Sequence, residues 1–228
     1  MPHEVVNQMV TFPNEASEVA GYLARPSDQG RFPGVVVIQE WWGLVPHIKD
    51  VADRFAAEGF VAIAPDLYHG QAATAPDQAM QLARSLTWET AVHDLKATAK
   101  HLAGLPYSNG KVGSVGFCMG GGMSYRLAAH ADVLSAAVIF YGSSPNQIEE
   151  AATVSCPILG LYGETDARIT GAVPDLTEAL KRNGKSIETH VYAGAPHAFF
   201  NDTAPSYREE AAKDAWARTL AFFRQHLA

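Results

Sequence analysis

Cys118 lies in the segment Gly116–Gly120, which reads G-F-C-M-G, and it directly follows the predicted strand Lys111–Phe117. In a nucleophile elbow, G-x-S-x-G, the central residue occupies a sharp turn between a strand and a helix. Both glycines are needed there because a Cβ would collide with neighbouring backbone. The start of the helix favours a thiolate, and the N–H of Met119 would point at a developing oxyanion. The pattern predicts a nucleophilic cysteine, the alternative being a small buried side chain in a glycine-rich turn.

An acid and a histidine follow two later predicted strands. Asp166 comes after Pro157–Tyr162, and His197 comes after Ile187–Tyr192. Taken singly, the aspartate could be a turn or helix-capping residue and the histidine a packed structural side chain. Taken together, the chain order of nucleophile, acid and histidine is that of an α/β-hydrolase. We therefore predict a catalytic triad of Cys118, His197 and Asp166.

A second acid, Glu40, follows the apolar run Val35–Ile38. In α/β-hydrolases the loop after this strand supplies the second oxyanion N–H, which here belongs to Trp41. This position would bring Glu40 next to the nucleophile. The alternative is an exposed loop carboxylate, but the apolar neighbours on both sides argue against it.

Strand patterns and helix patterns alternate along the chain. The expected strands are Val35–Ile38, Phe60–Ala64, Lys111–Phe117, Ser135–Tyr141, Pro157–Tyr162 and Ile187–Tyr192. Helical spacing runs between them and over the C-terminal segment, where Ser206 and Glu209 suggest a capping box. Before them, Val5–Phe12 and Val19–Arg25, separated by the turn-rich Pro13-Asn14-Glu15, predict an antiparallel hairpin.

This order predicts one α/β domain spanning residues 1–228. The expected architecture is a three-layer α/β/α sandwich of the α/β-hydrolase type, with a mostly parallel sheet and the N-terminal hairpin at its edge. Ligands bind at the carboxyl ends of the strands in such sheets.

The composition excludes several other classes of protein. The chain has 228 residues, 47% of them hydrophobic and 18% charged, and a net charge of −7. The apolar content is too high for disorder, no run reaches the ~18 apolar residues of a membrane span, and scattered basic residues argue against nucleic acid. The two cysteines cannot form a disulfide scaffold, and the nine histidines match no metal motif. Without a recognisable signal sequence, we expect a cytoplasmic protein that needs no metal or cofactor.

Five segments together resemble the dienelactone hydrolase (carboxymethylenebutenolidase) family. They are Gln39-Glu40-Trp41-Trp42-Gly43, Pro65-Asp66-Leu67-Tyr68, Gly116-Phe117-Cys118-Met119-Gly120-Gly121, Gly163-x-x-Asp166 and His197-x-Phe199. The resemblance extends from about residue 10 to the C-terminus. It implies hydrolysis of a lactone or ester through an acyl-cysteine. It also implies that the resting thiol is neutral and points toward Glu40, which takes its proton when substrate binds.

Two departures leave the substrate open. The family binds a substrate carboxylate with two arginines, and this chain has Gly70 and Asn201 in their places. This suggests a preference for neutral esters, although Arg84 or Arg168 are possible replacements. Aromatic side chains that could line a more apolar pocket are Trp41, Trp42, Tyr68, Trp88, Tyr141 and Phe199, each with core packing as its alternative.

We expect a small ester or lactone as the only partner, with no nucleic acid or membrane, and a monomer or weak homodimer. The alternative functions are a promiscuous carboxylesterase or thioesterase, a non-catalytic sensor with a hydrolase fold, and a redox-sensing thiol protein. Cys156, which precedes a proline at a strand start, is interpreted as a packing residue.

Overall fold

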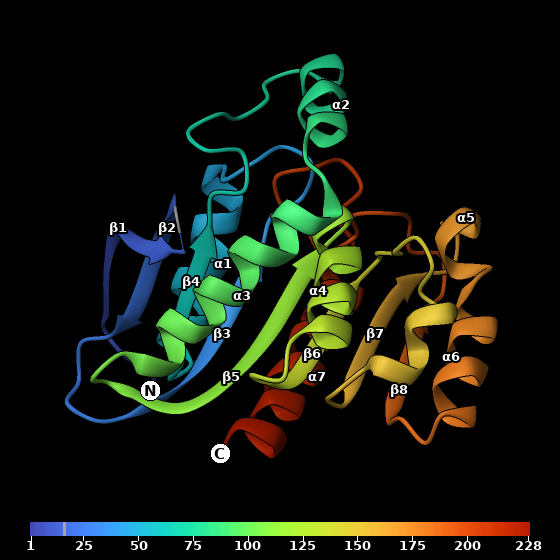
Figure 1. Ribbon diagram of the computed structural model, residues 1–228. Helices are drawn as coiled ribbons and strands as arrows, with labels where there is room; N and C mark the ends of the chain where they lie inside the picture. Colours follow the sequence, from blue (N-terminus) through green and yellow to red (C-terminus); the bar gives the residue numbers. More distant parts are fainter. Residues whose placement is uncertain (16) are drawn as a thin grey trace.

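One eight-stranded sheet runs through the computed structural model, which describes residues 1–15 and 17–228 (Figure 1). In sheet order the strands are β1 (Val5–Asn14), β2 (Ser17–Pro26), β4 (Val61–Pro65), β3 (Phe32–Ile38), β5 (Ser108–Phe117), β6 (Leu134–Phe140), β7 (Ile158–Gly163) and β8 (Ile187–Tyr192). The pairs β1–β2 and β2–β4 are antiparallel, and all other neighbours are parallel. The predicted mostly parallel sheet with an antiparallel N-terminal hairpin is confirmed.

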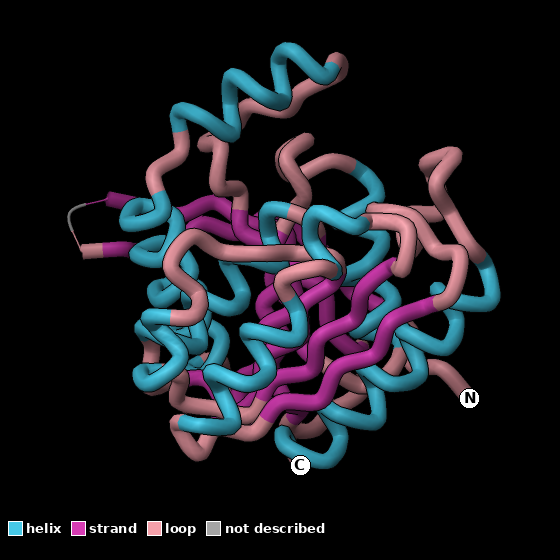
Figure 2. Tube along the Cα trace, turned by 90° about the vertical axis from the view of Figure 1, so that its right-hand side faces the viewer, coloured by secondary structure: helices cyan, strands magenta, loops and turns pink. Residues whose placement is uncertain are grey.

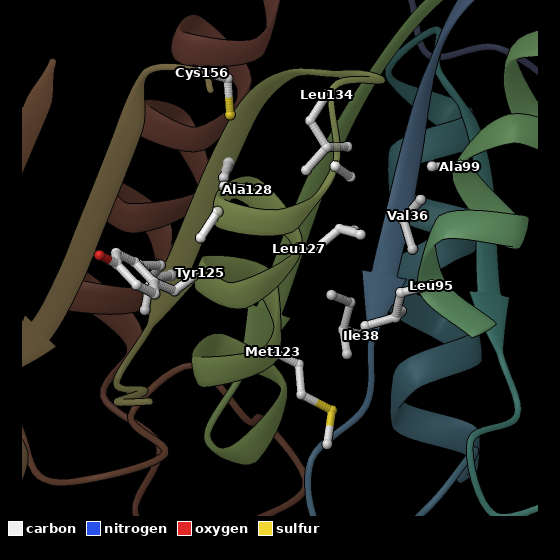
Figure 3. Close-up of a cluster of buried hydrophobic side chains, with 14 of the residues drawn as sticks. Val36, Ile38, Leu95, Ala99, Met123, Tyr125, Leu127, Ala128, Leu134 and Cys156 are labelled. Atoms are coloured by element: carbon white, nitrogen blue, oxygen red, sulfur yellow. The ribbon is translucent and has the colours of Figure 1, made fainter. Parts of the chain in front are cut away.

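Helices cover both faces of the sheet. Helices α1 (Pro46–Ala57) and α7 (Glu209–Leu227) pack on one face, and α3 (Trp88–Gly104), α4 (Met119–His130) and α6 (Val173–Arg182) on the other. Successive strand residues point to opposite faces of the sheet. Val35 and Val37 therefore join the hydrophobic core under α1 and α7, while Val36 and Ile38 join the core under α3, α4 and α6. Figure 3 shows Val36 and Ile38 facing α3 and α4. A strand buried on both faces therefore reads as a continuous apolar run.

Three short elements carry little apolar signal and were not predicted. They are α2 (Pro76–Ser85), α5 (Ala167–Thr170) and a 3₁₀ turn over Glu149–Thr153. Only Ala79 of α2 is buried, so the helix has no apolar stripe. Helix α2 stands apart from the sheet layers, at the end of the molecule toward which the arrowheads of β5 and β7 point in Figure 1. The same helix lies clear of the sheet at the top of Figure 2.

Two local predictions were wrong. The first strand continues through Pro13 and Asn14, because β1 is an edge strand and a proline there breaks no central ladder. The capping box before α7 does not form. Its cap residue is Arg208, and the hydroxyl of Ser206 instead donates to the Ala198 carbonyl at 3.1 Å.

The parallel strands end at one edge of the sheet. Glu40 follows β3, Cys118 follows β5, Asp166 follows β7 and His197 follows β8, so the topology brings the four side chains to that edge. In the part of the chain that the structure describes, no helix is both long and apolar enough to cross a membrane.

Candidate active site

Cys118 occupies a strained turn between β5 and α4. Its φ is 55° and its ψ is −117°, a conformation that costs energy for any residue other than glycine. A Cβ on Gly116 would lie 1.9 Å from the carbonyl oxygen of Gly120, and a Cβ on Gly120 would lie 2.4 Å from that of Gln39. Both glycines of the elbow are therefore required, because backbone approaches them too closely for any side chain.

Cys118 is one of the residues that line a cavity of about 240 Å³. The residues that line it are Trp41, Ala83, Trp88, Cys118, Met119, Tyr141, Ser143, Arg168, Ile169 and His197. They come from loops at the carboxyl ends of the strands and from α2, α3, α4 and α5. The cavity is thus small, largely aromatic and apolar, and holds the cysteine and the histidine together.

His197 is oriented by Asp166. The Nδ1 atom of His197 lies 2.5 Å from Oδ2 of Asp166, and the imidazole packs edge-on against the Tyr141 ring with centroids 5.1 Å apart. With Nδ1 bonded to the carboxylate, Nε2 is the nitrogen left for acid–base chemistry. Within the described residues, no hydrogen bond joins His197 to the sulfur of Cys118.

The surroundings of Cys118 disfavour its thiolate. Burial, then the negative charge of Glu40, raises the pKa of Cys118 to about 12, and the Met119 N–H only partly opposes this. The helix N-terminus, which the sequence suggested would favour a thiolate, is outweighed. At neutral pH the resting side chain is a neutral thiol.

Glu40 is buried, with 2% of its surface exposed, which excludes the alternative of an exposed loop carboxylate. The side-chain amide of Asn201 donates to its Oε2 at 2.8 Å. Burial raises the pKa of Glu40, while Asn201 and then the charge of His197 lower it. The Tyr141 hydroxyl also faces this carboxylate but makes no hydrogen bond of ordinary geometry.

The two residues whose N–H groups are predicted to bind an oxyanion, Trp41 and Met119, both line the cavity. The N–H of Met119 lies against the sulfur of Cys118. The N–H of Trp41 has no acceptor among the described residues, while its carbonyl accepts the Tyr68 hydroxyl at 3.1 Å. A free N–H beside the nucleophile suits an incoming carbonyl oxygen.

The aromatic residues predicted for the pocket divide into two groups. Trp41, Trp88 and Tyr141 line the cavity, whereas Trp42, Tyr68 and Phe199 do not. Trp42 packs edge-on against Trp41 with centroids 5.2 Å apart, and Tyr68 lies behind the Trp41 carbonyl. Phe199 is fully buried and packs against Tyr141. These three side chains support the wall of the cavity from behind.

The sequence did not single out Ala83, Ser143 or Ile169. They lie on α2, after β6 and on α5, and their residue types carry no chemical signal. Of the two arginines considered, Arg168 lines the cavity and Arg84 does not. Cys156 is 7% exposed in the core beside α4, as predicted (Figure 3).

Comparison with known proteins identifies the family of this chain. The model of the "Dienelactone hydrolase family" matches residues 19–227. "Protein usf" of Aquifex pyrophilus is 38% identical, over 97% of this chain and 100% of the relative. A "Putative carboxymethylenebutenolidase" of Synechocystis sp. is 35% identical, over 100% of both chains.

A crystal structure of a "Putative Dienelactone Hydrolase" from Klebsiella pneumoniae subsp. pneumoniae superposes with a TM-score of 0.90. It is 34% identical, over 98% of this chain and 100% of that chain. The matches cover nearly the whole chain in both sequence and structure. The chain therefore belongs to the dienelactone hydrolase family of hydrolases and has the α/β-hydrolase fold.

Proposed function

We propose that this hydrolase cleaves small esters or lactones without a metal, through an acyl-cysteine formed on Cys118. The observation that carries the proposal is one cavity lined by both Cys118 and His197, with His197 held by Asp166 at 2.5 Å. A nucleophile, a base and a group that orients the base are the parts of a catalytic triad. The volume of about 240 Å³ suits a small substrate.

Acylation begins with the neutral thiol. Substrate binding brings the sulfur into the cavity, and Glu40 takes the thiol proton. The thiolate attacks the carbonyl carbon, and the N–H groups of Trp41 and Met119 stabilise the oxyanion. The imidazolium of His197 then gives its proton to the leaving alkoxide, which departs as the alcohol.

Deacylation restores the starting protonation states, with the new proton of His197 supplied by water. Neutral His197 takes a proton from water, and the resulting hydroxide attacks the thioester. The carboxylic acid leaves, His197 is again protonated, and the proton held by Glu40 returns to the sulfur. Between turnovers the nucleophile is a thiol, which resists oxidation better than a thiolate.

The two cysteines of the chain provide a matched test. Cys118→Ala should lower kcat for p-nitrophenyl esters and lactones by at least ~10³, leaving only the contribution of binding and of the oxyanion donors. Cys156→Ala removes a thiol from the core outside the cavity, so the folded enzyme should keep its kcat. Wild-type turnover by Cys118→Ala would overturn the proposal.

A further inference from the structure

We infer that Asn201 is a positioning residue that selects the proton-accepting oxygen of Glu40. Its amide holds Oε2 and leaves Oε1 to receive the thiol proton. The inference rests on the proposed function and deepens it. The hydrogen bond from Asn201 Nδ2 to Oε2 is 2.8 Å long, and both side chains are buried, 6% and 2% exposed.

The amide of Asn201 has a fixed orientation. Its oxygen, Oδ1, accepts from the backbone N–H of Thr203 at 3.0 Å and from the Thr203 hydroxyl at 2.6 Å. If the amide were turned over, its NH₂ group would face the Thr203 N–H, and its oxygen would face a carboxylate oxygen. Thr203 therefore directs the Asn201 nitrogen to Glu40.

Asn201 also connects two loops of the site. It lies on the β8–α7 loop that carries His197, and its N–H donates to the Ala198 carbonyl at 3.1 Å. Glu40 lies on the loop after β3. One buried hydrogen bond thus joins the segment bearing the proton acceptor for the thiol to the segment bearing the proton donor for the leaving group.

The hydrogen-bond partner of Glu40 is the neutral amide of Asn201, and its neutrality affects how well the carboxylate can accept a proton. Among the described residues no lysine or arginine forms an ion pair with Glu40, and the groups that face it are Cys118, Tyr141 and His197. On the far side of Asn201, Asp202 pairs with Arg54 and lies 3.4 Å from Nδ1 of His47. An arginine in place of the amide would hold the carboxylate but weaken it as a proton acceptor.

The pH dependence of kcat/KM tests the inference, because its acidic limb reports ionisation of the base in the free enzyme. Asn201→Leu removes the hydrogen-bond donor to the charged form of Glu40. The midpoint of the acidic limb should therefore shift to higher pH, by on the order of one to two pH units. Activity at acidic pH should fall roughly tenfold or more and return toward wild type at alkaline pH. Thr203→Val, which loses only the hydroxyl that orients the amide, should shift the limb less and in the same direction.

Two controls separate positioning from mere support. Asn14 is a buried asparagine outside the cavity whose amide donates to buried Asp94 at 2.6 Å. Asn14→Leu should lower the melting temperature without moving the acidic limb. In a Glu40→Gln background, Asn201→Leu should cause no further shift, since both changes act through one carboxylate.

The outcomes distinguish this inference from the proposed function. If quenched wild-type enzyme carries acyl groups on Cys118 but the limb of Asn201→Leu and Thr203→Val is unmoved, the inference is wrong and the proposed function stands. A uniform loss of kcat at every pH would likewise show a structural role only. If the wild-type enzyme forms no acyl-Cys118, the proposed function fails and the inference falls with it.

Discussion

At the scale of single residues, the state of Cys118 depends on Glu40. Burial and the nearby carboxylate raise the pKa of the thiol to about 12, and the same glutamate that disfavours the thiolate is the group we propose as its proton acceptor. The charge therefore has two opposite effects on reactivity. These effects can be separated experimentally.

Glu40→Gln should make the thiol more acidic and the enzyme slower. Loss of the negative charge lowers the pKa of Cys118, so alkylation by iodoacetamide should reach its half-maximal rate at a lower pH than in wild type. Ester acylation should slow, because an amide cannot take the proton, while KM changes little. The measurements are the pH profile of alkylation and pre-steady-state acylation. Normal turnover in the variant, or an unshifted alkylation profile, would remove Glu40 from the mechanism.

Arg168 supplies a test of substrate charge. The departures at Gly70 and Asn201 predict tolerance of neutral esters, yet Arg168 lines the cavity and forms no ion pair within the described residues. Arg168→Gln should lower kcat/KM roughly tenfold for esters whose acyl group carries a carboxylate. Neutral esters of equal length should be unaffected. Equal losses on both substrates would make Arg168 a supporting residue of the wall.

At the scale of secondary-structure elements, the elbow requires α4 to lie against the ends of β3 and β5. A Cβ on Gly120 would meet the carbonyl oxygens of Gln39 and Ile38 at 2.4 and 2.5 Å. Both contacts are with backbone, so no side-chain rotation relieves them. The position of α4 also determines where Cys118 and the Met119 N–H point.

Gly120→Ala should therefore reduce both stability and activity. Overpacking of this kind costs about 1–3 kcal/mol or more, and displacement of α4 should lower kcat as well. Gly104→Ala is the matched control, because a Cβ there meets nothing within 4 Å at the end of α3. It should be neutral or raise the free energy of unfolding by up to ~1 kcal/mol. Urea unfolding measures the free energy of unfolding of each variant, and steady-state kinetics measure its kcat. A stable, active Gly120→Ala would contradict this packing argument.

The elements that the sequence predicted are those with strong apolar signals. Val35–Ile38 appears as a strand because a buried strand reads as an apolar run, although β3 already begins at Phe32. Helix α2 escaped prediction because its contact with the rest is mainly Ala79. The chemistry-bearing residues of the site were predictable from type and order. Phe199 was misplaced because an aromatic residue near a histidine looks the same whether it lines a cavity or packs behind it.

At the scale of the whole molecule, the right-handed crossovers bring loops from distant parts of the sequence to one edge of the sheet. The same arrangement buries ionisable side chains, and burial disfavours their charged forms. His47, at the start of α1, is 5% exposed, and burial lowers its pKa although Asp202 opposes the shift. Stability should therefore depend on pH through this histidine.

The sign of the dependence follows from proton binding. In the unfolded chain a histidine gains a proton below pH ~6.5, whereas folded His47 resists it until a lower pH. Its contribution to the free energy of unfolding is complete above pH ~6.5 and is lost as the pH falls toward the lowered value. Relative to wild type, His47→Gln should gain stability as the pH decreases from 7 toward 5. A difference between the two proteins that is constant with pH would refute this linkage.

The central claim is that the reaction passes through an acyl group on Cys118. The most direct measurement is peptide mass spectrometry of enzyme quenched during turnover of a p-nitrophenyl ester, using wild type and His197→Ala. A nitrophenolate leaves without a proton, so His197→Ala should still acylate but should deacylate slowly and accumulate the adduct. We expect the mass of the acyl group on the peptide that contains Cys118, and none on the peptide that contains Cys156. Release of nitrophenolate with Cys118 unmodified in both proteins would contradict it.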